Sequence, residues 1–216
     1  MLYYIGKFIL TALFKIFGRL TVVGREQVPR QGGVVLAANH VSYADPPLIG
    51  CAAPRKIRFM AKSELFSNRF FAALISAVGA FPVRRGVADR QALRTAQELL
   101  TGGDAMVIFI EGRRSADGIL QPPELGTAMI ALRAGVPIVP VALINSDRFL
   151  PYKSKWLHWS HVKVVFAEPL LFPHLAGKEG DRAALQEVSY AVARRIAELL
   201  RAHGAAERVP EGYGHA

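Results

Sequence analysis

A histidine and an aspartate five residues apart are the first residues in this chain whose types and spacing could do chemistry. They are His40 and Asp45, in the segment Asn39-His-Val-Ser-Tyr-Ala-Asp45. Within a turn, the carboxylate can accept the imidazole N–H, which fixes the tautomer and leaves the other ring nitrogen as a base near neutral pH. The pair lacks the nucleophile of a hydrolase triad, so a substrate hydroxyl would have to attack an activated acyl group itself. Alone the pattern is weak, because a loop histidine near an aspartate is more often a capping or surface pair.

Paired arginines at the ends of apolar segments are the second candidates. Segment 79–86 contains Arg84 and Arg85, and segment 109–115 contains Arg113 and Arg114 together with Glu111 and Gly112. Guanidinium groups bind phosphate oxygens through forked N–H donors, so either pair could hold a phosphorylated substrate. A further apolar strand, 138–143, has a proline inside it. Each segment also has a simpler explanation: surface arginines, a turn glycine, and an edge-strand proline.

Alternating strands and helices must position these residues. Short apolar runs predict strands at 33–38, 57–61, 80–83, 105–110, 138–143 and 161–166, and helical periodicity predicts helices at 64–77, 88–100, 126–134 and about 185–199. This alternation predicts an α/β fold: a single layered domain whose largely parallel central sheet is flanked by helices. Chemistry is then expected where strands end and loops begin.

The first 23 residues predict an amphipathic helix that lies in a membrane interface. They contain no acidic residue, and Lys7, Thr11, Lys15 and Arg19 fall on one helical face, opposite an apolar face. Two alternatives are an ordinary helix packed on the domain and a transmembrane span, which the cations would interrupt. We therefore predict an interfacial helix over 1–23, the α/β domain over 24–205, and a loose tail over 206–216.

Composition narrows the function classes. The chain has 216 residues, 27 Lys plus Arg against 17 Asp plus Glu, a net charge of +10, and 51% hydrophobic residues. Such apolar content excludes a disordered chain. A single cysteine, Cys51, excludes a disulfide framework and a cysteine-rich zinc site, and the six scattered histidines show no metal-ligand spacing. Nucleic acid would explain the charge but not the apolarity, whereas an anionic membrane surface explains both.

In their order along the chain, these segments resemble the glycerolipid acyltransferase family, typified by 1-acyl-sn-glycerol-3-phosphate acyltransferases. The resemblance covers about Val34 to Leu143, half of the chain. The first family motif, Asn-His-x4-Asp, matches Asn39, His40 and Asp45; the second matches Gly79 and Arg85; the third matches Glu111, Gly112, Arg114 and Ser115; and the fourth matches Val139, Pro140 and Val141. The segment 60–66, with Lys62, is also in keeping with the family.

The resemblance implies a role for each matched residue. His40 is the general base and Asp45 its orienting carboxylate. Arg85 and Arg114, with Lys62, bind the acceptor phosphate, and Glu111 holds an arginine or a glycerol hydroxyl. Asn39 and Gly112 complete the substrate-binding set, and the fourth motif shapes the acyl side. No metal and no cofactor are implied; the acyl donor is acyl-CoA or acyl-carrier protein.

The implied reaction is acylation of 1-acylglycerol-3-phosphate (lysophosphatidic acid) to phosphatidic acid in phospholipid synthesis. The implied location is the cytoplasmic face of the cell membrane, as a peripheral or monotopic protein on an anionic bilayer, with no nucleic-acid partner. Four departures, at Arg84, Ile110, Arg113 and Glu124, alter charge or bulk near the phosphate site. They leave glycerol 3-phosphate or another lyso-lipid open as acceptor. Activation of water by the same dyad would instead give a thioesterase or lipid hydrolase. A non-catalytic membrane-binding protein would be expected to have a broken dyad, and this dyad is intact.

Overall fold

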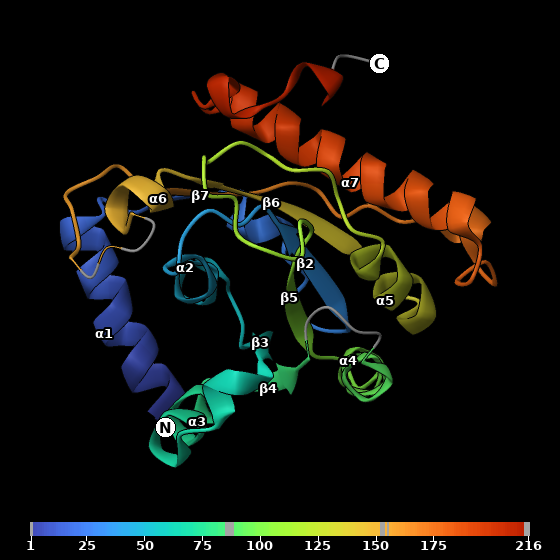
Figure 1. Ribbon diagram of the computed structural model, residues 1–216, viewed down its shortest axis with the longest axis horizontal. Helices are drawn as coiled ribbons and strands as arrows, with labels where there is room; N and C mark the ends of the chain where they lie inside the picture. Colours follow the sequence, from blue (N-terminus) through green and yellow to red (C-terminus); the bar gives the residue numbers. More distant parts are fainter. Residues whose placement is uncertain (1, 85–88, 152–153, 155, 214–216) are drawn as a thin grey trace.

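The protein forms one seven-stranded mixed sheet between two layers of helices (Figure 1). The computed structural model describes residues 2–84, 89–151, 154 and 156–213. The strand order is β1-β7-β6-β2-β5-β3-β4. The strands are β1 (Thr21–Val23), β2 (Val34–Ala38), β3 (Ile57–Lys62), β4 (Ala80–Val83), β5 (Ala105–Phe109), β6 (Ile138–Ile144) and β7 (Lys163–Phe166).

Five neighbouring strands, β6, β2, β5, β3 and β4, run parallel, and β7 pairs antiparallel with β6. Their carboxyl ends therefore share one edge of the sheet. That edge carries His40 after β2, Glu111 after β5, and Lys62 at the end of β3. The predicted α/β domain with a largely parallel sheet is confirmed.

The two faces of the sheet bury different helices because successive side chains of a strand point to opposite sides. Val35 and Ala37 of β2 join the core beneath α4 (Arg90–Thr101), α5 (Gly126–Ala134) and α7 (Arg182–Ala202). Val34, Leu36 and Ala38 join the core beneath α1 (Leu2–Phe17) and α2 (Asp45–Ala52). Since both faces are covered, β2 is buried along its whole length, which explains its continuous run of apolar residues.

The helix predicted over 64–77 is divided in two. A 3-10 turn covers Ser63–Phe66, and α3 covers Arg69–Ala77. Asn68 causes the break, because its side-chain oxygen accepts the backbone N–H groups of Phe70 and Phe71 and so begins a new helix. The short helices α2 and α6 (Ser146–Phe149) and the edge strand β1 were not predicted.

The predicted boundary after residue 23 is wrong. Helix α1 ends at Phe17, and β1 then pairs parallel with β7, from Thr21 opposite Lys163 to Val23 opposite Val165. The segment 21–23 therefore belongs to the sheet of the α/β domain. A run of β-branched residues after a glycine and a left-handed Arg19 (φ 43°) accounts for the change from helix to strand.

Helix α1 turns part of its polar face toward the domain, contrary to the predicted orientation. The Nζ of Lys7 donates a hydrogen bond to the Ala53 carbonyl (2.7 Å), and burial lowers the pKa of this lysine. Phe14 is buried and packs edge-on against Phe149. Phe8 and Ile9, however, are 76% and 58% exposed. The helix is thus docked on the domain while retaining an exposed apolar face.

The tail predicted to be loose is ordered from residue 206 to 213. After α7 the chain forms two 3-10 turns, Ala206–Arg208 and Glu211–Tyr213, which pack against the domain. Arg208 and Tyr213 are buried. Residues 214–216, with His215, lie outside the described part. Within the described residues, no helix has both the length and the apolarity that a membrane crossing requires.

Candidate active site

His40 and Asp45 form a buried pair at the carboxyl end of β2. The imidazole Nδ1 lies 2.7 Å from Asp45 Oδ2, and the residues are 5% and 0% exposed. The same carboxylate oxygen accepts the backbone N–H groups of Val41 and Ser42, both at 2.7 Å. An oxygen that already accepts two N–H groups requires Nδ1 to be the donor, so the neutral ring carries its basic lone pair on Nε2.

The start of α2 holds Asp45 in place. Asp45 is the first residue of the helix and Pro46 and Pro47 follow it, where missing N–H groups leave no intrahelical bond unmade. The Asp45 backbone N–H donates to the Ser42 carbonyl (3.3 Å). The four residues between histidine and aspartate are therefore wound into a turn around the carboxylate.

The end of β5 and the segment after it fix the histidine from a second direction. The Phe109 ring stacks on the imidazole, with 3.8 Å between centroids and 16° between planes. Glu111 Oε1 accepts the His40 backbone N–H (2.8 Å), and the Ser115 backbone N–H donates to the His40 carbonyl (2.8 Å). The ring plane and both backbone groups of His40 are thus held by the last residue of β5 and by the loop that follows it.

Glu111 is a buried carboxyl engaged by main-chain donors. Its second oxygen accepts the Gln121 backbone N–H (3.2 Å), and the residue is 4% exposed. Burial raises its pKa from 4.5 to about 7, against the opposing effect of the two N–H donors, and the nearby carboxylates of Asp45 and Asp117 raise it further. Glu111 therefore titrates near neutral pH beside the histidine.

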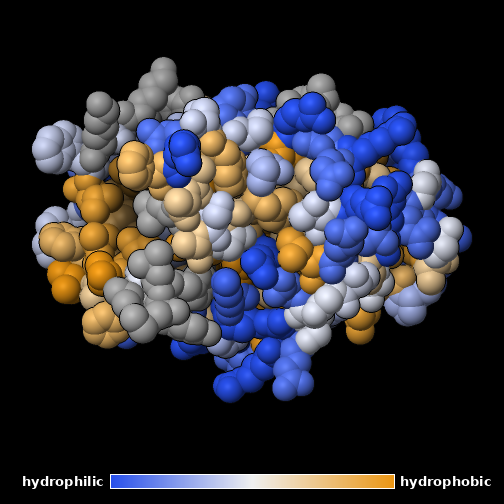
Figure 2. All heavy atoms as spheres, turned by 90° about the horizontal axis from the view of Figure 1, so that it is seen from below, coloured by the Kyte–Doolittle hydropathy of each residue, from blue (hydrophilic) through white to orange (hydrophobic). Residues whose placement is uncertain are grey.

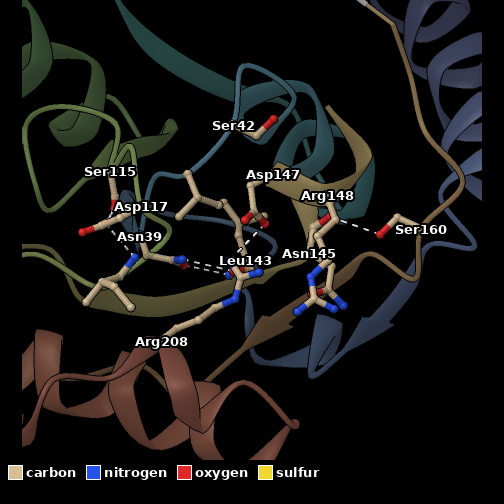
Figure 3. A network of polar contacts seen from close by, with 12 residues as sticks. Asn39, Ser42, Ser115, Asp117, Leu143, Asn145, Asp147, Arg148, Ser160 and Arg208 are labelled. Carbon is tan, nitrogen blue, oxygen red and sulfur yellow. Dashed lines mark hydrogen bonds and ion pairs between the residues drawn. The ribbon is translucent and has the colours of Figure 1, made fainter. Parts of the chain in front are cut away.

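Asn39 joins β2 to β6 through its side chain, as Figure 3 shows. Its amide nitrogen donates to the Leu143 carbonyl (3.1 Å), and its amide oxygen accepts the Leu143 N–H (2.7 Å). The pairing of β2 with β6 ends at Ala38 opposite Val141. Beyond it, the Asn39 side-chain amide bonds to the main chain of β6 as a backbone peptide group would, and so extends the pairing by one step. Both polar ends of Asn39, predicted to bind substrate, are thus engaged with main chain immediately before His40.

Three more of the predicted substrate-binding residues, Gly112, Arg114 and Lys62, lie at the same sheet edge. Gly112 is exposed with φ 64°, a conformation that favours glycine. The half-buried Arg114 places its guanidinium 3.4 Å from the centre of the Tyr43 ring, a cation–π contact. Lys62, exposed and paired with Glu64 at 3.0 Å, ends β3, two strands from β2 and so about 10 Å away.

The second motif is described only in part. Arg85 lies outside the described residues. Gly79, with φ 96°, precedes β4, and a Cβ there would lie 2.8 Å from the Ile57 carbonyl oxygen, so this position requires glycine. Arg84 is exposed, its Nε 3.5 Å from Asp89. No group of three or more His, Cys, Asp or Glu in the described part of the chain is placed to hold a metal ion.

Sequence reasoning missed several contacts around His40 and Asp45. Phe109 meets His40, and Tyr43 meets Arg114, only because β2 and β5 are neighbours in the sheet. Gln121 meets Glu111 within the segment that follows β5. By sequence, Phe109 is an ordinary core residue of its strand. An aromatic residue directly before the third motif is the one hint in the sequence that could have found this contact.

A buried histidine oriented by a carboxylate could act as a general base toward a substrate hydroxyl or water, and Ser42 in the same turn donates its own hydroxyl to the Leu150 carbonyl (2.9 Å). Comparison with known proteins identifies the class. Residues 19–144, more than half of the chain, match the family model described as Acyltransferase. The chain belongs to this acyltransferase family and is an O-acyltransferase.

Named relatives share most of the chain. It is 31% identical over 196 residues to the 1-acyl-sn-glycerol-3-phosphate acyltransferase of Bacillus subtilis, covering 88% of this chain and 92% of the relative. It is 34% identical over 184 residues to the lyso-ornithine lipid O-acyltransferase of Pseudomonas aeruginosa, covering 77% and 70%. The crystal structure of the 1-acyl-sn-glycerophosphate (LPA) acyltransferase PlsC from Thermotoga maritima superposes with a TM-score of 0.69 at 26% identity, covering 91% of this chain and 81% of that one.

Proposed function

We propose that this enzyme transfers a fatty acyl group from acyl-CoA or acyl-carrier protein to the free hydroxyl of lysophosphatidic acid, giving phosphatidic acid. The observation that carries the proposal is the single carboxylate oxygen of Asp45 that holds Nδ1 of His40 and two backbone N–H groups. This arrangement sets one tautomer and presents Nε2 as a base. The names of several relatives support the acceptor.

In the proposed mechanism, Nε2 of His40 removes the proton from the acceptor hydroxyl as the oxygen attacks the thioester carbonyl. The new C–O ester bond forms, the C–S bond breaks, and the proton passes from the imidazolium to the thiolate that leaves. Asp45 stabilises the imidazolium without taking its proton. No covalent acyl-enzyme is formed.

In this proposal the surrounding residues either bind the substrate or hold the main chain of the site. Arg114, Lys62 and Arg85 bind the acceptor phosphate as cationic donors. Asn39 and Glu111 hold the main chain on either side of His40 rather than the substrate. Gly112 lets the loop after β5 turn in the left-handed conformation close to the site.

Replacing His40 with Ala tests the general base. We expect kcat to fall by about 10²- to 10⁴-fold, the usual contribution of a general base, while circular dichroism stays unchanged. His174→Ala is the matched control, because His174 also pairs with a carboxylate, Glu187 at 2.8 Å, but on the exposed surface. Full activity in the His40 variant would refute the mechanism. Thiol release by the wild type that ignores the acceptor would instead indicate a thioesterase.

A second acceptor has specific support. The identity to the lyso-ornithine lipid O-acyltransferase, 34%, is higher than the 31% to the Bacillus subtilis relative. A panel of lysophosphatidic acid, lyso-ornithine lipid and glycerol 3-phosphate, each assayed with one acyl-CoA, separates these candidates. We expect the highest kcat/KM with lysophosphatidic acid. A higher value with lyso-ornithine lipid would overturn that assignment and leave the transfer chemistry intact.

The proposed membrane contact is a mainly aromatic surface, here called the aromatic surface, that comprises Phe8, Ile9, Phe70, Trp156 and Trp159. These side chains are between 58% and 91% exposed, and the Trp159 ring lies 5.0 Å from that of Phe17 in α1. Hydrophobic residues gather on the side of the molecule where α1 and α3 lie (Figures 1 and 2). Exposed aromatics, together with the exposed Lys15 of α1, suit the interface of an anionic bilayer. We assign the enzyme to the cytoplasmic face of the membrane as a peripheral or monotopic protein.

The double variant Phe8→Ser/Phe70→Ser tests this surface without removing the helix, whose Phe14 belongs to the core. Binding to vesicles containing anionic phospholipid should fall by at least about tenfold, because each phenylalanine contributes roughly 1.5–3 kcal/mol when buried. Leu171→Ser is the control, a 69% exposed leucine outside the aromatic surface. Equal binding by the double variant and the wild type would refute the assignment.

A further inference from the structure

The C-terminal segment of residues 206–213, here called the C-terminal latch, is bonded to the loop of residues 117–121 that follows the third motif. The Arg208 carbonyl accepts the Leu120 N–H at 2.9 Å, and the Tyr213 hydroxyl donates to the Gln121 carbonyl at 3.0 Å. Arg201 of α7 donates to the Tyr213 carbonyl at 2.7 Å and so ties the end of the latch to its own helix. The latch therefore holds this loop at two successive residues.

The held loop leads directly to the histidine. Gln121, whose carbonyl accepts the Tyr213 hydroxyl, donates its backbone N–H to Glu111, and Glu111 accepts the His40 backbone N–H through its other oxygen. Three consecutive hydrogen bonds thus connect Tyr213 to the main chain of His40. Apart from the Tyr213 hydroxyl and the Glu111 carboxylate, the donors and acceptors in this series are backbone groups, so only these two side chains add rotamer freedom to it.

A second series of contacts connects the C-terminal latch to the turn between His40 and Asp45, here called the catalytic turn. Arg208 Nη1 donates to Asp147 of α6 at 2.9 Å, as Figure 3 shows, and the arginine is 6% exposed. Helix α6 ends next to Leu150, whose carbonyl accepts the Ser42 hydroxyl at 2.9 Å. Ser42 lies between His40 and Asp45. The two series of contacts therefore meet the catalytic turn at His40 and at Ser42.

The hydroxyl of Tyr213 keeps its proton throughout the physiological range. Burial, followed by the nearby Tyr190 and Glu111, raises the pKa of Tyr213 to about 12. The bond to the Gln121 carbonyl is therefore made by a neutral donor at any pH at which the enzyme would be assayed.

We propose that Tyr213 and Arg208 are positioning residues for acyl transfer, which set the main chain of His40 through the loop 117–121 and through α6. The proposal rests on the proposed role of His40 as general base. It adds an element outside the region matched by the family model, which ends at residue 144. The latch acts on the geometry of the base and not on substrate binding.

The test compares Tyr213→Phe with Tyr190→Phe in the full-length protein. Tyr190→Phe is the control because it removes a hydroxyl from a neighbouring tyrosine and leaves the bond to Gln121 in place. We expect Tyr213→Phe to lower kcat about threefold to tenfold, as the loss of one hydrogen bond of ordinary strength would, with KM for both substrates unchanged. Arg208→Ala should act similarly, with partial recovery in Arg208→Lys, which keeps a cation for Asp147.

Amide hydrogen exchange gives a readout that does not depend on turnover. Exchange at Gln121 and His40, measured without substrate, should quicken in Tyr213→Phe and remain unchanged in Tyr190→Phe. Unchanged exchange and unchanged kcat in Tyr213→Phe would overturn the proposal, and so would a rise in KM alone. Retained activity in His40→Ala would refute the general base separately, because the exchange result does not use the reaction.

Discussion

The exchange of one atom in Asn39 gives a sharp test of how the site is held. In Asn39→Asp, the amide nitrogen that donates to the Leu143 carbonyl at 3.1 Å becomes an oxygen. The other oxygen still accepts the Leu143 N–H, a bond of 2.7 Å in the wild type. Asn39 is 2% exposed and Leu143 is fully buried, so water does not replace the lost donor. Once ionised, the introduced carboxylate would place a negative oxygen against a buried carbonyl.

The expected cost depends on pH. An unsatisfied buried carbonyl costs about 1–3 kcal/mol, and a buried carboxylate adds to this, so we expect Asn39→Asp to lose roughly 3 kcal/mol of unfolding free energy at pH 8. That cost corresponds to a rise of about two units in the pKa of the new carboxyl. Because its pKa is higher in the folded than in the unfolded state, the stability is present at low pH and is lost as pH rises through the folded-state value. Below about pH 4 the protonated acid can donate to Leu143 and the deficit should nearly vanish.

The assay is urea denaturation of wild type, Asn39→Asp and Asn39→Ala from pH 4 to 8, each variant referred to wild type at the same pH. Asn39→Ala removes both bonds and should cost about 2–5 kcal/mol at every pH. A deficit of Asn39→Asp that stays constant with pH would refute the proposed geometry. A cost below about 0.5 kcal/mol in Asn39→Ala would show that the amide does not hold β2 to β6.

Three further outcomes can be measured in the same way. The folded-state pKa of Glu111 is about 7, against 4.5 for the free group, so its contribution to stability is fully present below pH 4.5 and falls by up to about 3 kcal/mol as pH rises through 7. The unfolding free energy of Glu111→Gln should lack this pH dependence. Parallel pH profiles of the variant and the wild type would contradict the raised pKa. Gly79→Ala should lower the unfolding free energy clearly more than Gly32→Ala. Both positions have positive φ (96° and 75°), which alone costs an alanine about 1–2 kcal/mol, but only the Cβ at position 79 would press against a backbone oxygen. Equal losses would argue against that close approach. Phe14→Ala should lower the unfolding free energy by about 3–5 kcal/mol, since its ring is buried against Phe149, and a loss below about 1 kcal/mol would mean that α1 is not docked in solution.

Local sequence determined much of this protein. The spacing of His40 and Asp45 allows a turn in which the carboxylate reaches the imidazole, and both groups lie within one short segment. The apolar runs of β2 and β5 predict buried strands, because only strands covered on both faces are apolar at every position. Parallel strands then bring their carboxyl ends to one edge, so the clustering of His40, Glu111 and Lys62 could be predicted from the sequence.

Contacts between distant segments were decided only by the tertiary structure. Asn39 and Leu143 are 104 residues apart, and Tyr213 and Gln121 are 92 apart. Their pairing depends on the strand order β6-β2-β5 and on the return of the chain after α7, which no local pattern specifies. Likewise, the periodicity of α1 predicts two faces but not which of them docks, because the apolar stem of Lys7 can be buried while its ammonium finds a carbonyl. The sequence alone identified His40 as the candidate base and Asp45 as its partner, whereas the hydrogen bonds from distant segments that hold this pair form only in the folded chain.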